Sequence, residues 1–157
     1  CGSEEKCAFI MSLGCTHPVN YNRGNLPDLV SGVLDGGKCD LVVESIGGDM
    51  MGKALHCLKP RGMLITLGAA SRQPAMINAV ELLANNLIVA GFHLTSYTED
   101  KAATMQAVQE LYQWLAEERL TVIVRHALPL EDAVRIHEMV ENRQTTGKVV
   151  LTTGYEP

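Results

Sequence analysis

The chain has 157 residues, of which 46% are hydrophobic and 20% charged, and its formal net charge is −5 at pH 7. This length fits one domain with a substantial core. A negative net charge argues against a general nucleic-acid binder, which would show a concentrated basic face. No apolar run approaches the roughly 18–20 residues that cross a bilayer, and the chain does not begin like a signal peptide. We therefore expect no nucleic-acid partner, no membrane span and a cytoplasmic location.

The cysteines are odd in number and never spaced as Cys-x-x-Cys. This pattern favours small, reduced, buried thiols of a cytosolic protein over a disulfide framework or a zinc site. We therefore expect no metal ligands among them. They are Cys1, Cys7, Cys15, Cys39 and Cys57.

The N-terminal part predicts two helices. The first runs from Ser3 to Leu13, with Ser3 as N-cap and Gly14 as the stop. A short extended segment, 18–21, follows it. The second helix runs from Leu26 to Leu34 and is opened by a proline, which is favoured in the first helical turn.

Three apolar runs rich in β-branched residues then predict strands buried on both faces of a parallel sheet. They cover residues 39–45, 63–68 and 87–92. Helices are expected between them at 50–58 and 76–86, with a turn at 60–62. Apolar strands that alternate with short helices predict a Rossmann-type, doubly wound α/β sheet.

The last third has a different order of elements. A long helix is expected at 99–118, where Met105, Val108, Leu111 and Leu115 form one apolar stripe. A strand at 122–126, a helix at 130–142 and a strand at 148–152 follow it. These predict a tail that returns into a neighbouring sheet. We divide the chain into the domain of this Rossmann-type sheet, 1–120, and the tail, 121–157.

Several short motifs occur along the chain in a characteristic order and spacing. Together they resemble the second half of a medium-chain dehydrogenase/reductase of the zinc-free quinone oxidoreductase group. Thr16-His17-Pro18 and Gly91-Phe92-His93-Leu94 resemble the prostaglandin reductase and vesicle amine transport protein branches. The motifs are Gly2-Ser3-Glu4-Glu5-Lys6, Leu13-Gly14-Cys15, Asn20-Tyr21, the stretch from Asp40 to Gly48, the stretch from Cys57 to Ile65, Leu67-Gly68-Ala69-Ala70 and the stretch from Gly147 to Leu151.

The resemblance implies a cofactor-binding half whose first strand and glycine-rich loop lie upstream of Cys1. It implies an NADPH-dependent enzyme that transfers hydride to an enone or a quinone, with a homodimer in the full-length protein and little activity in this segment alone. A tail that packs with the catalytic domain is also implied. No catalytic residue is assigned, because the resemblance places the chemistry mainly in the other half.

The resemblance assigns the 2′-phosphate of NADPH to Ser3, Lys6 and Tyr21, beside Gly2. An NAD enzyme usually has an acidic residue at this strand end, whereas this chain has none before its first helix. The residue types therefore favour NADPH over NADH. From the residues alone, two alternatives stay open. Lys6 would then be a solvated lysine, and Tyr21 would be an ordinary aromatic residue at a strand end.

The carboxyl ends of the predicted strands supply the remaining candidates, because ligands of open α/β sheets bind beyond those ends. Small residues at Gly68 and Ala69 would let the backbone approach the nicotinamide ribose, with Ser45 on the neighbouring strand. Phe92 and Leu94 would wall the nicotinamide pocket, although core packing is an open alternative for both.

His93 lacks a placed carboxylate partner, so it is not taken as catalytic. Many relatives have a cofactor-binding asparagine before Gly147, where this chain has Thr145-Thr146. A non-catalytic nucleotide-binding module and a vesicle-associated interaction protein of the same fold stay open as alternatives to an enzyme.

Overall fold

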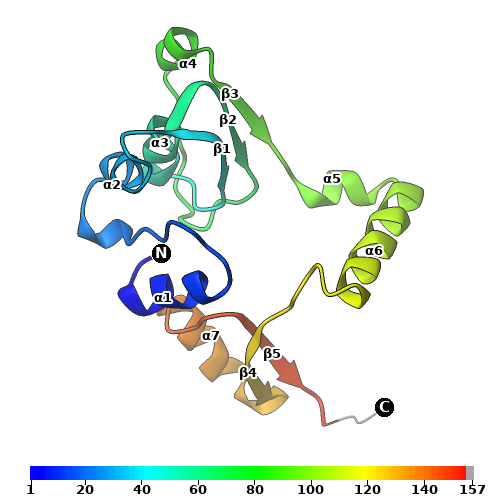
Figure 1. Cartoon of the computed structure of the whole chain (residues 1–157). Coiled ribbons are helices and arrows are strands. Elements are labelled where there is room, and N and C mark those ends of the chain that lie inside the picture. The colour runs from blue at the N-terminus through cyan, green and yellow to red at the C-terminus, as the bar shows by residue number, and fades with distance from the viewer. Residues whose placement is uncertain (155–157) are drawn as a thin grey trace. The chain divides into compact units, whose positions relative to one another are not determined.

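The computed structural model describes residues 1–154 and forms two compact units (Figure 1). The first unit is Cys1–Glu99 and the second begins at Asp100. This division falls before the long helix, whereas the sequence placed a boundary after it, at 120/121. Within the described residues, no helix is long and apolar enough to span a bilayer.

The first unit opens with two helices close to their expected positions. Helix α1 is Glu4–Ser12 and has Ser3 as its N-cap, and helix α2 is Leu26–Val33. A 3-10 turn, η1, covers Tyr21–Arg23. The segment expected to be extended is 18–21. Asn20 has extended backbone dihedrals, and the turn begins at Tyr21.

A three-stranded parallel sheet forms the centre of the first unit. Its strands are β1 (Cys39–Glu44), β2 (Leu58–Thr66) and β3 (Ile88–Gly91), in the order β1-β2-β3. Helix α3 (Asp49–His56) packs on β1 and β2, and α2 packs on α3 (Figure 1). Helix α4 (Ala79–Asn85) packs on β2. The core cluster joins α3 to β2 through Met51, Ala54, Leu55, Leu58 and Leu64.

Strand β2 begins earlier than the sequence predicts and contains the expected turn as an irregularity. Pairing jumps from Cys39–Leu58 to Leu41–Met63, so residues 59–62 bulge out of the ladder. Arg61 within the bulge has a left-handed φ of 67°. The turn at 60–62 is therefore present locally, but Leu58 already pairs with β1 and is buried.

Helix α5, Leu94–Thr98, is absent from the sequence prediction. Its threonines, serine and tyrosine have modest helix propensity, and the sequence predicts no element between the strand that ends at 92 and the helix that begins at 99. The long helix is confirmed as α6, Lys101–Ala116, and Asp100 caps it by accepting from the amides of Ala102 and Ala103.

The second unit contains a separate parallel pair of strands. Strand β4 is Val124–Pro129 and β5 is Lys148–Thr152, joined by the 3-10 turn η2 (Leu130–Asp132) and helix α7 (Ala133–Glu141). The expected strand–helix–strand tail is therefore confirmed, with β4 displaced toward the C-terminus. The parallel pairing in both units confirms the α/β class.

Candidate functional site

The two backbone segments that bear Ser3 and Tyr21 lie side by side. The terminal amine of Cys1 donates to the carbonyl of Val19 at 2.7 Å, and the amide of Tyr21 donates to the carbonyl of Cys1 at 3.0 Å. This is the hydrogen-bond pattern of a parallel bridge between Cys1 and Asn20. It brings Tyr21 next to the residues that begin α1.

Gly2, Ser3, Lys6 and Tyr21 meet at this corner, which we call the N-terminal polar cluster. A Cβ atom at position 2 would lie 2.7 Å from the Tyr21 hydroxyl oxygen, so that oxygen lies directly over the Gly2 backbone. The Ser3 hydroxyl accepts from the Lys6 amide at 3.2 Å, which places Lys6 in the first helical turn. The structure thus brings these four residues together.

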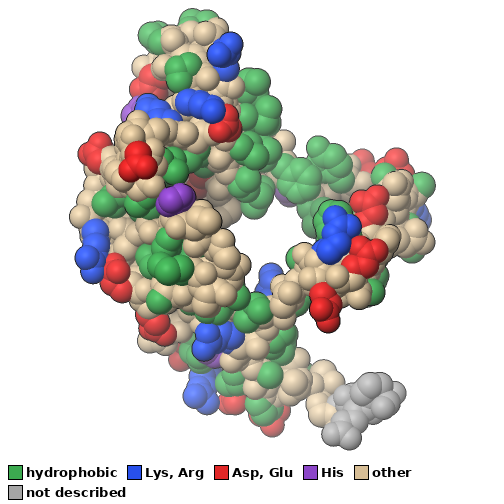
Figure 2. Space-filling view, in the orientation of Figure 1, with side chains coloured by type: hydrophobic (Ala, Val, Ile, Leu, Met, Phe, Trp, Pro, Cys, Tyr) green, Lys and Arg blue, Asp and Glu red, His purple; other side chains and the backbone are tan. Residues whose placement is uncertain are grey.

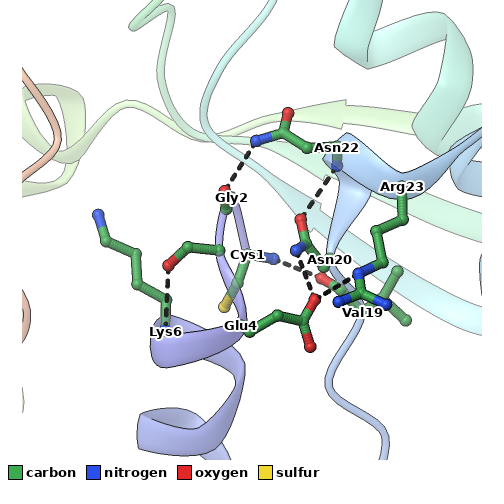
Figure 3. A network of polar contacts seen from close by, with 9 residues as sticks. Cys1, Gly2, Glu4, Lys6, Val19, Asn20, Asn22 and Arg23 are labelled. Atoms are coloured by element: carbon green, nitrogen blue, oxygen red, sulfur yellow. Dashed lines mark hydrogen bonds and ion pairs between the residues drawn. The ribbon is translucent and has the colours of Figure 1, made fainter.

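Four polar residues that the sequence analysis did not select complete the cluster. The Glu4 carboxylate accepts from the Asn20 side-chain amide at 2.6 Å and lies 2.7 Å from the Arg23 Nε atom. The Asn22 side-chain amide donates to the Gly2 carbonyl at 2.7 Å. Figure 3 shows these contacts on one side of Gly2, with the Lys6 side chain directed away from Glu4 and Arg23.

These contacts are exposed, so they add little to the free energy of unfolding. Their effect is positional, because they fix the 1–3 segment against the 19–23 segment. Glu4 also pairs with Arg23, and Lys6 is held in the first turn of α1 through the hydrogen bond that its amide donates to the Ser3 hydroxyl. An asparagine before a short turn, here Asn20 before η1, is a sequence signal for the turn but not for its pairing with Cys1.

A cavity of about 840 Å³ lies at the carboxyl ends of β2 and β3, and we call it the strand-end cavity. It includes three of the predicted residues, Gly68, Ala69 and Phe92. Leu94 is not among its lining residues and is 63% exposed on α5. The lining residues are Thr66, Leu67, Gly68, Ala69, Gly91, Phe92, His93, Ser96 and Tyr97.

Ser45 is not among the residues that line this cavity, but its backbone contacts Gly68, which is. A Cβ atom at Gly68 would lie 2.8 Å from the Ser45 carbonyl oxygen, so only glycine lets the two backbones approach this closely. The same carbonyl accepts from the Ala70 amide at 3.1 Å. At Gly91, by contrast, a Cβ atom would meet nothing within 4 Å. Ser45 and Gly68 therefore fix the path of the backbone on the β2 side.

The turn after β1 is held by a buried carboxylate that the sequence analysis did not select. Glu44 is 4% exposed, and its Oε1 atom accepts from the amides of Ile46 at 2.5 Å and Gly47 at 2.9 Å. Gly47 and Gly48 both have positive φ, at 74° and 56°. The carboxylate thus stabilises the turn that positions Ser45.

The titratable groups of the described residues, 1–154, give no sign of a metal centre. Among residues 1–154, no group of three or more His, Cys, Asp and Glu side chains could hold a metal ion. Cys57 is a buried thiol at the end of α3, and burial, with the nearby Cys39, raises its pKa above the ordinary value of 9.0. His93 is the residue before α5 and lines the strand-end cavity, where its side chain makes no cap hydrogen bond.

Comparison with known proteins gives a family. A family model for zinc-binding dehydrogenases matches residues 13–151. A 2-haloacrylate reductase from a Burkholderia species is 32% identical over 151 residues, which are 95% of this chain and 45% of that protein. Prostaglandin reductase-3 of Bos taurus is 30% identical over 172 residues, covering 96% of this chain and 44% of that protein.

Solved structures agree with these relatives. The Escherichia coli quinone oxidoreductase complexed with NADPH superposes with a TM-score of 0.85 at 28% identity, covering 96% of this chain and 47% of that one. The 2-haloacrylate reductase structure gives 0.81 at 30% identity, covering 98% and 48%. This chain spans about half the length of the relatives it matches. With its Rossmann-type α/β fold, the chain belongs to the zinc-binding dehydrogenase family of medium-chain dehydrogenases/reductases, in the zinc-free branch of quinone oxidoreductases.

Proposed function

We propose that this chain is the cofactor-binding portion of an NADPH-dependent oxidoreductase that reduces enones or quinones. Matches to a 2-haloacrylate reductase and to quinone oxidoreductases support the reaction class. In this proposal the segment alone is inactive, because its relatives are about twice as long. The full-length protein would be a cytoplasmic homodimer whose 121–157 region packs with the catalytic domain.

The N-terminal polar cluster is the observation that supports NADPH. The Tyr21 hydroxyl over Gly2 and the Ser3 hydroxyl at the start of α1 place two hydroxyl groups beside a first-turn lysine. Hydroxyl groups, backbone amides at a helix start and an ammonium group suit a phosphate anion. A neutral ribose 2′-hydroxyl would gain much less from the lysine charge than a phosphate does, so this cluster would discriminate in favour of the 2′-phosphate.

The strand-end cavity would receive the nicotinamide end of the same cofactor. Gly68 and Ala69 would allow close backbone approach, Phe92 would form a wall, and Leu94 would act at the cavity edge. When bound, NADPH supplies the hydride that, with a proton from solvent, saturates the carbon–carbon double bond of an enone. The residues of this chain orient the nicotinamide and exclude water from one of its sides.

Replacement of Lys6 in the full-length protein tests the proposal. Because a charge-assisted hydrogen bond to a phosphate contributes about 1.5–3 kcal/mol, Lys6→Ala should weaken NADPH binding by about 10- to 150-fold. NADH binding should change less than about twofold, since NADH lacks the 2′-phosphate. Isothermal titration calorimetry with both cofactors measures the two affinities.

The matched control is Lys101→Ala, which removes another first-turn lysine, at the start of α6. It should leave both affinities unchanged. Equal losses of NADPH and NADH affinity in Lys6→Ala would reject the 2′-phosphate assignment. NADPH binding without turnover of any enone or quinone would favour the non-catalytic alternatives instead.

A further inference from the structure

Helix α5 brings a second aromatic ring onto the first one in the strand-end cavity. The chain leaves β3 at Gly91, passes Phe92, and turns at His93 into α5, where the Ser96 amide donates to the His93 carbonyl at 3.1 Å. This turn returns Tyr97 to Phe92. Their ring centroids are 4.8 Å apart, with an angle of 27° between the ring planes.

The stacked pair is only partly covered by protein. Phe92 is 39% exposed and Tyr97 is 59% exposed, and both line the cavity. Figure 2 shows hydrophobic side chains gathered over β3 and α5. Large aromatic surface left in water is unfavourable, and a partly exposed aromatic wall in a cavity is typical of a ligand site.

The cavity has the size and the mixed lining that a small planar molecule needs. Its volume of about 840 Å³ falls within the roughly 300–1,000 Å³ of ligand pockets. Ser96 and His93 add polar groups beside the aromatic pair. Gly68 and Ala69, which follow the carboxyl end of the neighbouring strand β2, leave space for a ligand. A planar aryl group would gain stacking energy here that an alkyl group would not.

We infer that the Phe92–Tyr97 stack makes Tyr97 a specificity-determining residue, which selects enones whose double bond is conjugated to an aryl ring over enones with an alkyl substituent. The inference rests on the proposed function, and it adds a substrate class and a residue to it. Phe92 is fixed by the end of β3, so Tyr97 is the ring that a substitution can remove with less disturbance of the sheet.

A pair of enones that differ in one substituent tests the inference in the full-length protein. Benzylideneacetone and ethylideneacetone have the same enone and carry a phenyl or a methyl group, respectively. Tyr97→Leu should lower kcat/KM for benzylideneacetone by about 3- to 10-fold, the value of one aromatic contact. For ethylideneacetone the change should stay below about twofold. Tyr97→Phe should keep the wild-type preference, and Tyr112→Leu, which replaces an exposed tyrosine of α6, is the matched control.

Each alternative result has a definite meaning. Equal losses for both enones in Tyr97→Leu would overturn the inference, because they indicate a general structural role. A raised KM for NADPH with an unchanged preference would also overturn it, since the nicotinamide would then be the stacked ring.

A binding measurement separates this inference from the proposed function. If no variant turns over any enone, the proposed function fails, and saturation-transfer NMR with benzylideneacetone still tests the stack. Binding that weakens by about 3-fold or more in Tyr97→Leu supports an aryl site. Binding that is absent in the wild type, or equal in wild type and Tyr97→Leu, overturns it.

Discussion

The N-terminal polar cluster and the strand-end cavity lie in one compact unit but are built from different interactions. The cluster is a surface corner held by short, exposed hydrogen bonds and one ion pair, such as the 2.7 Å contact between Asn22 and Gly2. The cavity is a recess of about 840 Å³ shaped by close backbone approach and by two stacked rings. Charge and hydrogen bonding suit one end of a dinucleotide, and flat apolar surface suits the other.

The two regions should therefore respond to substitution in different ways. Exposed polar contacts contribute little to stability, so changes in the cluster should affect ligand affinity more than folding. Backbone contacts beneath the cavity are close-packed, so changes there should affect folding first. Substitutions in each region, each compared with the same kind of substitution at a control position, test this difference.

Gly68→Ala should give the largest effect on stability. The added Cβ would lie 2.8 Å from the Ser45 carbonyl oxygen, and such overpacking costs about 1–3 kcal/mol of unfolding free energy. The control is Gly91→Ala at the end of β3, where a Cβ would meet nothing within 4 Å. Urea denaturation of both variants measures the difference. Similar losses in both variants would show that the Gly68 contact relaxes without cost.

Asn22→Ala should affect affinity more than stability. It removes the bond to the Gly2 carbonyl, so NADPH affinity should fall by about 2- to 10-fold and unfolding free energy by at most about 1 kcal/mol. Asn85→Ala removes a similar exposed bond, from Asn85 to the Glu81 carbonyl on α4, and should leave NADPH affinity unchanged. Calorimetry and thermal denaturation check both. An unchanged affinity in Asn22→Ala would mean that the cluster is ordered without this contact.

Cys57 should give the smallest effect, outside both regions. Its pKa in the folded state is raised above 9.0, so the fold favours the protonated thiol. The stabilisation is complete below pH 9.0, the value expected in the unfolded chain, and is lost as the pH rises through the folded pKa. The Tm of the wild type should therefore fall more steeply above that pH than the Tm of Cys57→Ala. Parallel slopes would contradict a buried, protonated thiol.

Local sequence signals predicted much of the fold. Ser3 as an N-cap, the proline that opens α2 and the β-branched runs of β1 to β3 each depend on short-range chemistry, and each marks its element in the structure. Helix α5 was missed because its threonines, serine and tyrosine do not favour a helix by themselves.

The candidate site was predictable only in part. The family resemblance selected Ser3 and Tyr21, and the strand ends selected Gly68 and Phe92. The structure brings these residues into two groups. The contacts of Asn22 and Glu4 depend on the pairing of Cys1 with Asn20, which no local pattern indicates. Tyr97 reaches the cavity only because α5 turns the chain back on Phe92, and the same turn leaves Leu94 outside the lining.

Because of the bulge at residues 59–62, the number of residues in β2 before Met63 does not set the register of its pairing with β1. Regular pairing with β1 resumes at Met63 and continues to Thr66, where the cavity begins, so residues added before Met63 would not shift the strand end. Arg61 already adopts a left-handed conformation there, and the Lys59 and Asp40 side chains form an ion pair at the surface. Residues 59–61 of this bulge are exposed. They are therefore a suitable place to insert a peptide tag or a fluorescent label that reports on the protein without disturbing its ligand site.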